Sequence, residues 1–427
     1  MKQSQLFTKL LKEAPKEEVS VNAKLLIRAG FIHKEMAGVF AFLPLGLRVI
    51  EKIKQIIKEE MDELGGEQVL LTSLQDPEIW KKSGRWDDKV VDNWFKTKLA
   101  NGADAGIANT HEEPLANLMK EYVNSWRDLP RYVYQFQTKF RNELRAKSGL
   151  MRVREFLMKD LYSFSRTEEE FKDFYEKCAA AYLKIFSRVG LKNYTFRTFA
   201  SGGSFSKFSD EFQAISEAGE DIIYIDQKKK IAINKEVYQD EVLDELGLKK
   251  ADLEEKKAIE IGNIFPLGTK YSSALGLTFK DKNGKDNPVI MGSYGIGLGR
   301  LMGTIAEIFH DERGILWPEA VAPFQIHLIQ LGENSEVKQT AQKIYDDLQK
   351  KGIEVLYDDR EGKAAGEKFA EADLLGIPLR MVVSEKTLKQ DSIEIKKRNE
   401  QKTKLVSLKS DFNKLVEIGF QHRSTSR

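Results

Sequence analysis

The sequence lacks the features of several common protein classes. Its 427 residues include a single cysteine, Cys178, which excludes an internal disulfide and a zinc site made of several cysteines. We interpret Cys178 as a small core residue of a protein in a reducing compartment. The longest apolar run, residues 39–47, is interrupted by Pro44 and Gly46 and is too short to span a bilayer. Because the first residues are too charged for a signal peptide, we expect a cytoplasmic protein without a membrane partner.

The sequence also lacks an excess of charge of either sign. Lys and Arg number 68 and Asp and Glu number 66, so the net charge is only +2, although 31% of the residues are charged. A nucleic-acid partner would therefore have to bind a local basic patch. The length predicts two or three domains with a sizeable core, and no internal repeat or low-complexity segment is present.

Residues 132–160 carry the most informative pattern, which predicts an antiparallel hairpin. Apolar side chains alternate from Tyr132 to Phe140, as expected of a half-buried strand, and the second arm presents Arg152, Arg154 and Phe156 on one face. Arginine forks suit phosphates, a carboxylate suits an exocyclic amine, and a ring suits base stacking. The hairpin therefore predicts a nucleotide site. A solvated, salt-bridged surface is the alternative for any single arginine.

The hairpin resembles the second signature motif of the class II aminoacyl-tRNA synthetases. That motif reads Phe-Arg-x-Glu, then a loop, then Arg-x-x-x-Phe-x-x-x-Asp, and the matching residues here are Phe140, Arg141, Glu143, Arg152, Phe156 and Asp160. The resemblance implies that Arg141 holds the ATP α-phosphate and is the main catalytic residue. It also implies that Glu143 binds the adenine amine, Arg152 reaches the γ-phosphate and Phe156 stacks under adenine.

Two further segments resemble the other class II motifs. Residues 292–300 form a glycine-spaced loop after an apolar run; a dinucleotide-binding fold is the alternative, but no preceding βαβ unit is evident. In the third class II motif, glycines let the backbone approach the nucleotide, and Arg300 would cap adenine or grip the γ-phosphate. A helix over 47–64 and a strand over 68–72 resemble the first motif, which implies a homodimer, although Thr72 stands where the family has proline.

The segment from Asn109 to Pro114 resembles the Thr-x-Glu loop of prolyl-tRNA synthetases. A cationic amino group needs an anion and a hydroxyl nearby, and Glu112 and Thr110 supply both. The structural alternative is a helix start with Thr110 as N-cap and Glu113 at the third helical position, a capping box. Both interpretations can hold at once, and we interpret His111 as structural rather than as a base.

The resemblance to bacterial prolyl-tRNA synthetases covers nearly the whole chain. It implies a proline site made by Thr110, Glu112, Arg141, Ser204 and Ser206, and it adds Gln213 to the ATP site. Two residues depart from the family pattern, since Asp210 and Asn263 stand where the family has histidine. The residues implied to contact tRNA are Arg145, Lys147, Arg360, Lys368 and Asp373.

The expected fold class is α+β with two domains. A class II catalytic domain, an antiparallel sheet flanked by helices, is expected over residues 1–320, and an α/β anticodon-binding domain over 324–427, where strand and helix patterns alternate. Residues 20–64 have a helical pattern with a break at Pro44. Residues 237–258 are expected to form a short, exposed helical connector in place of the editing insertion that many bacterial relatives carry.

The function implied by the resemblance is the activation of L-proline with ATP, followed by transfer of prolyl to the 3′ end of tRNA(Pro). Mg²⁺ would accompany ATP, no zinc is expected, and the partners would be proline, ATP, tRNA(Pro) and a second copy of the chain. A non-catalytic paralogue is one alternative, but it would be expected to lose Arg141, Glu143 or Arg300. A synthetase for threonine is another, opposed by the Thr110–Glu112 loop and the lack of a metal-ligand set.

Overall fold

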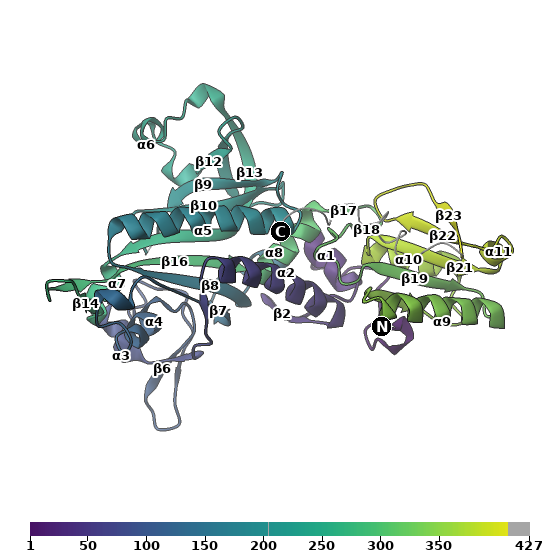
Figure 1. Ribbon diagram of the computed structural model, residues 1–427, viewed down its shortest axis with the longest axis horizontal. Coiled ribbons are helices and arrows are strands. Elements are labelled where there is room, and N and C mark those ends of the chain that lie inside the picture. The colour runs from purple at the N-terminus through teal and green to yellow at the C-terminus, as the bar shows by residue number, and fades with distance from the viewer. Residues whose placement is uncertain (204, 409–427) are drawn as a thin grey trace. The chain divides into compact units, whose positions relative to one another are not determined.

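The computed structural model describes residues 1–203 and 205–408, which form two compact units (Figure 1). One unit comprises residues 34–40 and 53–304, and the other comprises residues 1–33, 41–52 and the described part of 305–427. Two helices, α2 (Pro44–Glu63) and α8 (Leu298–Ile308), contribute residues to both units. The predicted division at residues 320–324 stays a prediction.

A nine-stranded sheet forms the centre of the unit that contains residues 53–304. Its strand order is β10-β9-β12-β11-β13-β16-β8-β7-β3, and the β13-β16-β8-β7 portion is antiparallel throughout, which confirms the predicted sheet. The strands are β3 (Glu67–Gln68), β7 (Arg131–Phe140), β8 (Glu155–Ser165), β9 (Thr195–Ser201), β10 (Phe208–Ile215), β11 (Asp221–Asp226), β12 (Ile231–Asn234), β13 (Leu253–Gly268) and β16 (Ile290–Gly297).

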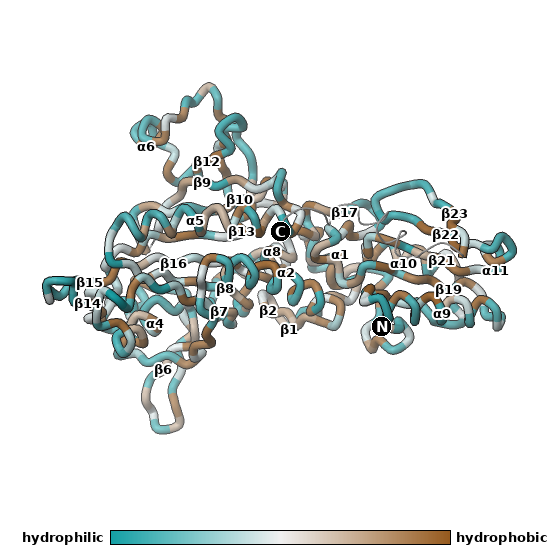
Figure 2. Tube along the Cα trace, in the orientation of Figure 1, coloured by the Kyte–Doolittle hydropathy of each residue, from teal (hydrophilic) through white to brown (hydrophobic). Residues whose placement is uncertain are grey.

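The long helix α5 (Glu168–Arg188) covers β8 and β16 (Figure 1). Its start agrees with the sequence, because the Thr167 side chain accepts a hydrogen bond from the Glu170 backbone N–H and acidic residues fill the first turn. Its buried face includes Phe174 and Tyr182. In Figure 2, α5 and α9 (Ser335–Lys350) alternate between hydrophilic and hydrophobic colours, as expected of helices with one buried face.

Shorter elements complete this unit around the sheet. They position two loops that carry charged residues of the candidate site. One loop precedes α4 and the other follows α3. The helices are α3 (Pro77–Lys82), α4 (Glu112–Met119), α6 (Asp240–Glu245) and α7 (Lys270–Leu275), and the strands are β4 (Leu74–Gln75), β5 (Lys96–Lys98), β6 (Asp104–Ile107), β14 (Thr278–Lys280) and β15 (Asp286–Pro288).

The helical expectation for residues 20–64 is wrong in its middle part. The first helix, α1 (Val21–Arg28), ends at Arg28 and is followed by Gly30, whose φ is +68°; a hairpin of β1 (Ile32–Met36) and β2 (Val39–Phe42) then precedes α2. Gly38 has a φ of +75°, which suits a tight turn that other residues rarely adopt. Gly46 packs directly on the Phe31 carbonyl, where a Cβ would lie 2.0 Å from the oxygen.

The expected connector at residues 237–258 is also partly wrong. Its helix, α6, is short, and residues from Leu253 onward already belong to the long strand β13. Val242 and Leu243 of α6 are buried against Ile233 of β12, so this segment has a small core of its own. Apolar residues spaced within a charged stretch therefore fold back on the sheet instead of remaining exposed.

The second unit contains a five-stranded sheet with the order β20-β19-β21-β22-β23. β19 pairs in parallel with β20 and β21, and the last three strands are antiparallel. The alternation of strands and helices predicted from residue 324 onward is confirmed. The elements are α1, α9, α10 (Ala365–Leu375), α11 (Glu385–Leu388), β17 (His310–Asp311), β18 (Gly314–Ile315), β19 (Ile326–Leu331), β20 (Val355–Asp358), β21 (Leu379–Ser384), β22 (Ser392–Lys397) and β23 (Lys404–Ser407).

Neither unit contains a membrane-spanning helix: within residues 1–203 and 205–408, none combines the length and the low polarity that a bilayer requires.

Candidate active site

The hairpin of β7 and β8 opens onto a cavity in the larger unit. The two strands pair with Lys139 opposite Phe156, and the backbone N–H of Arg141 donates to the Arg154 carbonyl at 2.8 Å, which fixes Arg141 at the end of β7. The cavity lies among the loop after β7, the strands β8, β13 and β16, and the start of α8. Its lining includes five of the six residues predicted to bind ATP, namely Arg141, Glu143, Arg152, Phe156 and Arg300.

Arg141 is the most unusual cation of this cavity. Its guanidinium carbon lies 5.3 Å from the centre of the Phe156 ring, and within the described parts of the chain no carboxylate forms an ion pair with it. Burial and the nearby Arg300 lower the pKa of Arg141, because both disfavour its charge. A guanidinium held in this way is available to an incoming phosphate or carboxylate.

Glu143 and Arg152 form a pair on the rim of the cavity. The Arg152 Nε and Nη2 atoms donate to Glu143 Oε2 at 2.8 and 2.7 Å, and the Asn93 side chain donates to Glu143 Oε1 at 3.3 Å. Because Arg152 is exposed, it can exchange this partner for a phosphate.

Arg300 follows the glycine-rich end of β16 and points back across the sheet. Its Nε donates to the Met151 carbonyl at 2.9 Å, and its Nη1 donates to the Glu260 carbonyl at 3.0 Å and to Glu260 Oε2 at 2.8 Å. A Cβ on Gly295 would lie 2.8 Å from Asn263 Oδ1 and 2.6 Å from Met158 Cε, so a larger residue would displace the ends of these two side chains. The chain thus passes closely beside the cavity.

Gln213, the sixth predicted ATP residue, pairs with Glu260 across β10 and β13. Its buried side-chain nitrogen donates to Glu211 and to Asp221, each at 2.8 Å, whereas its buried Oε1 has no partner in the described residues. Burial and the neighbouring Glu260 raise the pKa of Glu211 to about 8, and burial raises the pKa of Asp221. This side of the site therefore concentrates carboxylates that a cation would stabilise.

The predicted proline-binding loop has a different geometry from a capping box. The N-cap of α4 is His111, which makes no side-chain cap, so the structural alternative of a capping box at Thr110 is wrong. Instead the Thr110 hydroxyl donates to Glu112 Oε2 at 2.5 Å, and the Ser293 hydroxyl donates to Oε1 at 3.0 Å. The Glu113 carboxylate instead accepts a hydrogen bond from the Ser83 hydroxyl. Two hydroxyls thus orient Glu112 and leave it further acceptor capacity.

His111 is part of the support beneath this loop. It is fully buried, its Nε2 lies 3.0 Å from the Thr72 carbonyl, and the Lys139 ammonium lies 2.8 Å from its Nδ1. Burial and the charge of Lys139 lower the pKa of His111 to about 4. Lys139 also pairs with Asp160 at 2.8 Å. His111 is therefore a neutral structural residue near pH 7, as interpreted from the sequence.

Of the two remaining predicted proline residues, the structure describes only Ser206, which lies in the loop before β10. The Ser206 hydroxyl donates to the Phe208 carbonyl at 2.7 Å, whereas Ser204 lies outside the described residues. Both departures from the family pattern have local partners. Asp210 accepts hydrogen bonds from Tyr175 and Arg197 at 2.8 and 2.9 Å, and Asn263 donates to Glu260 at 2.7 Å.

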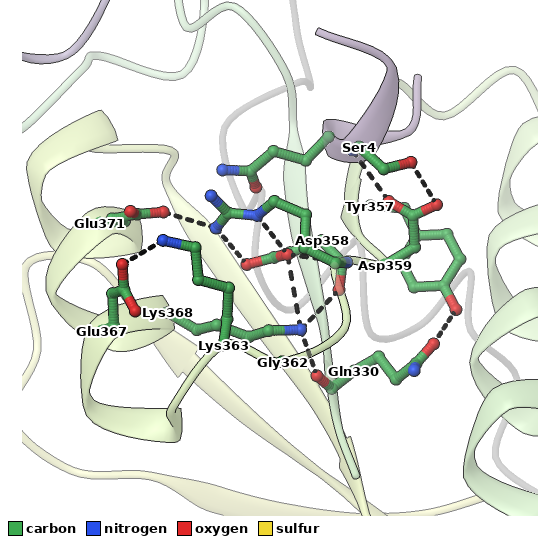
Figure 3. Close-up of polar contacts among 12 residues, drawn as sticks. Ser4, Gln330, Tyr357, Asp358, Asp359, Gly362, Lys363, Glu367, Lys368 and Glu371 are labelled. Carbon is green, nitrogen blue, oxygen red and sulfur yellow. Dashed lines mark hydrogen bonds and ion pairs between the residues drawn. The ribbon is translucent and has the colours of Figure 1, made fainter. Parts of the chain in front are cut away.

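The residues predicted to contact tRNA lie in two places. Arg145 is exposed on the hairpin loop, where Lys147 pairs with Glu220 at 3.2 Å. The other three belong to ionic clusters of the five-stranded unit. Lys368 is buried and donates to the Gln330 carbonyl at 2.9 Å (Figure 3). Arg360 pairs with Asp358 and Glu371, and Asp373 pairs with Arg313.

Several residues of the site were not found from the sequence. Glu211, Asp221 and Glu260 gather only because distant strands pair, and no local motif indicates this. Arg85, which contacts Glu113, lies in the loop after α3, where no local motif indicates a charge pair. Its burial among aromatic rings had no sequence signal beyond Trp80 and Trp86 nearby.

Comparisons with known proteins agree with this geometry. The family model described as tRNA synthetase class II core domain (G, H, P, S and T) matches residues 95–309, and that described as anticodon binding domain matches 321–418. The proline–tRNA ligase of Maricaulis maris is 37% identical and the alignment covers 98% of this chain and 99% of that protein. The proline–tRNA ligase of Zymomonas mobilis is also 37% identical, and the alignment covers 99% of this chain and 100% of that protein.

Solved structures share the fold. Prolyl-tRNA synthetase from Cryptosporidium parvum, complexed with L-proline and AMP, has a TM-score of 0.74 at 17% identity, and the match covers 94% of this chain and 75% of that one. Prolyl-tRNA synthetase from Giardia lamblia, in complex with prolyl-adenylate, has a TM-score of 0.76 at 18% identity. The match covers 93% of this chain and 78% of that one.

Proposed function

The chain belongs to the proline–tRNA ligase family of class II aminoacyl-tRNA synthetases, and from this membership we propose that it activates L-proline with ATP and transfers prolyl to the 3′ end of tRNA(Pro). The observation that carries the proposal is the guanidinium of Arg141, which lies in the cavity without a carboxylate partner among the described residues. It neighbours Glu112, whose charge acts on the pKa of Arg141. An anion-binding group and a cation-binding group thus belong to one site.

The first reaction joins the proline carboxylate to the α-phosphorus of ATP. A carboxylate oxygen attacks, a new C–O–P linkage forms, and the bond from the α-phosphorus to the bridging oxygen breaks as pyrophosphate leaves with the electron pair. In the second reaction the terminal ribose hydroxyl of tRNA attacks the carbonyl carbon and AMP leaves. The first step depends on positioning and charge stabilisation rather than on a protein base, and Arg141 is placed to contact both the carboxylate and the α-phosphate.

Mg²⁺ fits the site as an ion that accompanies ATP. Within the described residues, no group of three or more acidic, histidine or cysteine side chains is arranged to hold a metal by itself. Mg²⁺ is usually held by one or two carboxylates together with substrate phosphates. Burial and the neighbouring Glu260 raise the pKa of Glu211, and we propose that these two acids would hold the ion. When bound, Mg²⁺ neutralises the phosphates; we propose no zinc requirement.

A second copy of the chain is the proposed partner in solution. β3 is an edge strand of the nine-stranded sheet, and the segment after it exposes Leu70 and Leu74. An unpaired strand edge beside exposed apolar side chains favours association. We propose a cytoplasmic homodimer, and sedimentation at the mass of one chain would refute the dimer.

The proposed activity is tested by ATP–pyrophosphate exchange with a panel of amino acids. Proline should support exchange best, and threonine should not. Alanine is smaller than proline, so the pocket cannot exclude it by size, and we expect alanine to be activated with a discrimination of roughly 10–200-fold. Failure of proline to support exchange would refute the proposed function.

Hydrolysis of alanyl-tRNA is not expected, because residues 237–258 contribute only a 3-10 turn, α6 and the start of β13. Incubation of the enzyme with preformed alanyl-tRNA(Pro) measures this directly. Rapid enzyme-dependent deacylation would show that the chain has an editing site after all.

The hairpin loop is proposed to contact the acceptor end of tRNA. Replacing both Arg145→Glu and Lys147→Glu should raise the KM for tRNA about tenfold or more, because two phosphate-binding charges become repulsive. Proline-dependent exchange should change little, since both side chains lie outside the cavity lining. Lys192→Glu, an exposed charge reversal in the turn after α5, is the matched control. Equal effects of the control and the double variant would contradict a specific contact.

The five-stranded unit is proposed to bind the anticodon through the surface shaped by Arg360, Lys368 and Asp373. Lys368 is only 3% exposed, so its role would be to hold the Gln330 and Asp358 carbonyls in place rather than to contact RNA. Footprinting of tRNA(Pro) bound to the full chain measures which nucleotides the protein protects. An unprotected anticodon would refute the proposed anticodon binding.

A further inference from the structure

A second layer of buried charge lies next to Glu112. Arg85, in the loop after α3, is 3% exposed, and its Nη1 lies 3.1 and 3.2 Å from the two carboxylate oxygens of Glu113 but 3.6 Å from Glu112 Oε2. Its guanidinium contacts the rings of three aromatic residues, Trp80, Phe205 and Tyr271. Arg85 thus lies between two carboxylates. It donates hydrogen bonds to Glu113, whereas the Thr110 and Ser293 hydroxyls donate to Glu112.

Glu113 has no route to the solvent or to a substrate. It is fully buried, and its Oε1 accepts a hydrogen bond from the Ser83 hydroxyl at 2.7 Å in addition to the contact with Arg85. A buried carboxylate of this kind is stable only while its cation is present. Glu113 therefore depends on Arg85 for its counter-charge.

The charges of this layer determine what Glu112 can offer. When Glu113 is ionised, it balances Arg85, and the negative charge of Glu112 remains for a cationic nitrogen. When Glu113 is neutral, Arg85 balances Glu112 instead, and the site has no net charge to attract a cation. The effect is large here because the three groups lie in a water-poor region.

We propose that Arg85 and Glu113 are positioning residues that keep the charge of Glu112 available to the imino cation of proline. The inference rests on the proposed function, since it assigns specificity within that site. Neither residue is expected to touch the substrate. Both act through Glu112, which holds the substrate nitrogen.

The titration of Glu113 supports this arrangement. Burial raises the pKa of Glu113 to about 7, against the opposing effect of Arg85 and with a further increase from Glu112. The groups that face it are Ser83 and Arg85 from the loop after α3, Glu112 on its own helix, and Lys270 and Tyr271 from α7. Because the carboxyl takes up a proton below its pKa, the KM for proline should rise as the pH falls from 8 to 6.

The test is steady-state exchange with the Glu113→Gln variant of the full chain. This change keeps the shape and an acceptor for Ser83 but removes the charge, so Arg85 should turn to Glu112. We expect the KM for proline to rise about tenfold or more, within the range measured for coupled neighbouring groups, with the KM for ATP unchanged. The dependence of the proline KM on pH between 6 and 8 should disappear. Glu121→Gln, an exposed acid just after α4, is the matched control.

A second variant separates a charge effect from a structural one. Replacing both Arg85→Met and Glu113→Gln removes the pair together, and the apolar side chain suits the aromatic surroundings. The double variant should recover most of the proline affinity that Glu113→Gln loses. A proline KM for Glu113→Gln equal to that of the parent, or additive losses in the double variant, would overturn the inference.

Ser83→Ala decides the question if Glu113→Gln does not fold in a thermal melt. Loss of the Ser83 hydrogen bond should raise the pKa of Glu113 further, so the rise of the proline KM should begin at a higher pH. An unshifted profile would overturn the inference. A parent enzyme that activates no proline would overturn the proposed function as well, whereas a proline-active enzyme with an insensitive Glu113→Gln variant overturns the inference alone.

Discussion

Replacement of Arg141 by alanine is expected to abolish proline-dependent ATP–pyrophosphate exchange. The loss should be on the order of 3–4 kcal/mol, or about 10²–10³-fold in rate, as when one preorganised charge donor is removed from an active site. The guanidinium has no carboxylate partner among the described residues, so its charge is available to the α-phosphate and to the attacking carboxylate. The measurement is the initial rate of exchange at saturating ATP and proline.

The stability of the same variant separates catalysis from folding. Because burial and Arg300 already lower the pKa of Arg141, its charge is destabilising in the empty site, and the alanine variant should melt no lower than the parent. Arg131→Ala, at the exposed start of the same strand, is the control and should retain full exchange. Exchange by Arg141→Ala within tenfold of the parent, or a large fall in melting temperature, would contradict the catalytic role.

Local patterns were sufficient to predict the hairpin and a nucleotide site on it, whereas the ATP roles of its residues were implied by the family resemblance. Period-two alternation fixes which face of a strand a residue occupies, so the positions of Arg141 and Phe156 on the hairpin followed from spacing alone. Arg300 was predicted from the family resemblance instead, because a glycine-spaced loop by itself also suits a dinucleotide-binding fold. The pairing of β7 with β8 and the cavity around these side chains agree with that prediction.

Pairing between distant strands could not be predicted in this way. Gln213 meets Glu260 because β10 adds to β13, and nothing in either segment specifies its partner. The hairpin of β1 and β2 was missed for a related reason. Its short apolar runs suit a helix or a strand equally, so periodicity alone does not distinguish the two.

The Thr110–Glu113 segment shows how one sequence pattern can serve two structures. Its spacing satisfies a capping box, but a capping box requires the Glu113 side chain to turn back to the helix start. Arg85 and Ser83 hold that side chain instead, and the Thr110 hydroxyl is left for Glu112. A contact between loops 28 residues apart thus determined which interpretation was correct.

Replacement of Glu112 by alanine is expected to impair the use of proline far more than the use of ATP. The imino cation would lose its only proposed anionic partner in a buried site, and removal of one member of a buried charge pair costs about 2–5 kcal/mol. We therefore expect kcat/KM for proline to fall about 30-fold or more, while the KM for ATP changes little, because Glu112 does not line the ATP cavity. The measurement is the exchange rate as a function of each substrate in turn.

Glu112→Gln distinguishes the charge of Glu112 from its hydrogen bonds. The amide keeps the side-chain length and an acceptor for Thr110 or Ser293, so a structural role would largely survive this change. A role in binding a cation would not, because the amide carries no charge to offer the substrate nitrogen. Two outcomes would show that Glu112 is structural and that the imino cation is bound elsewhere. One is normal proline use by Glu112→Gln but not by Glu112→Ala. The other is an equal fall of kcat/KM for proline and for ATP in either variant.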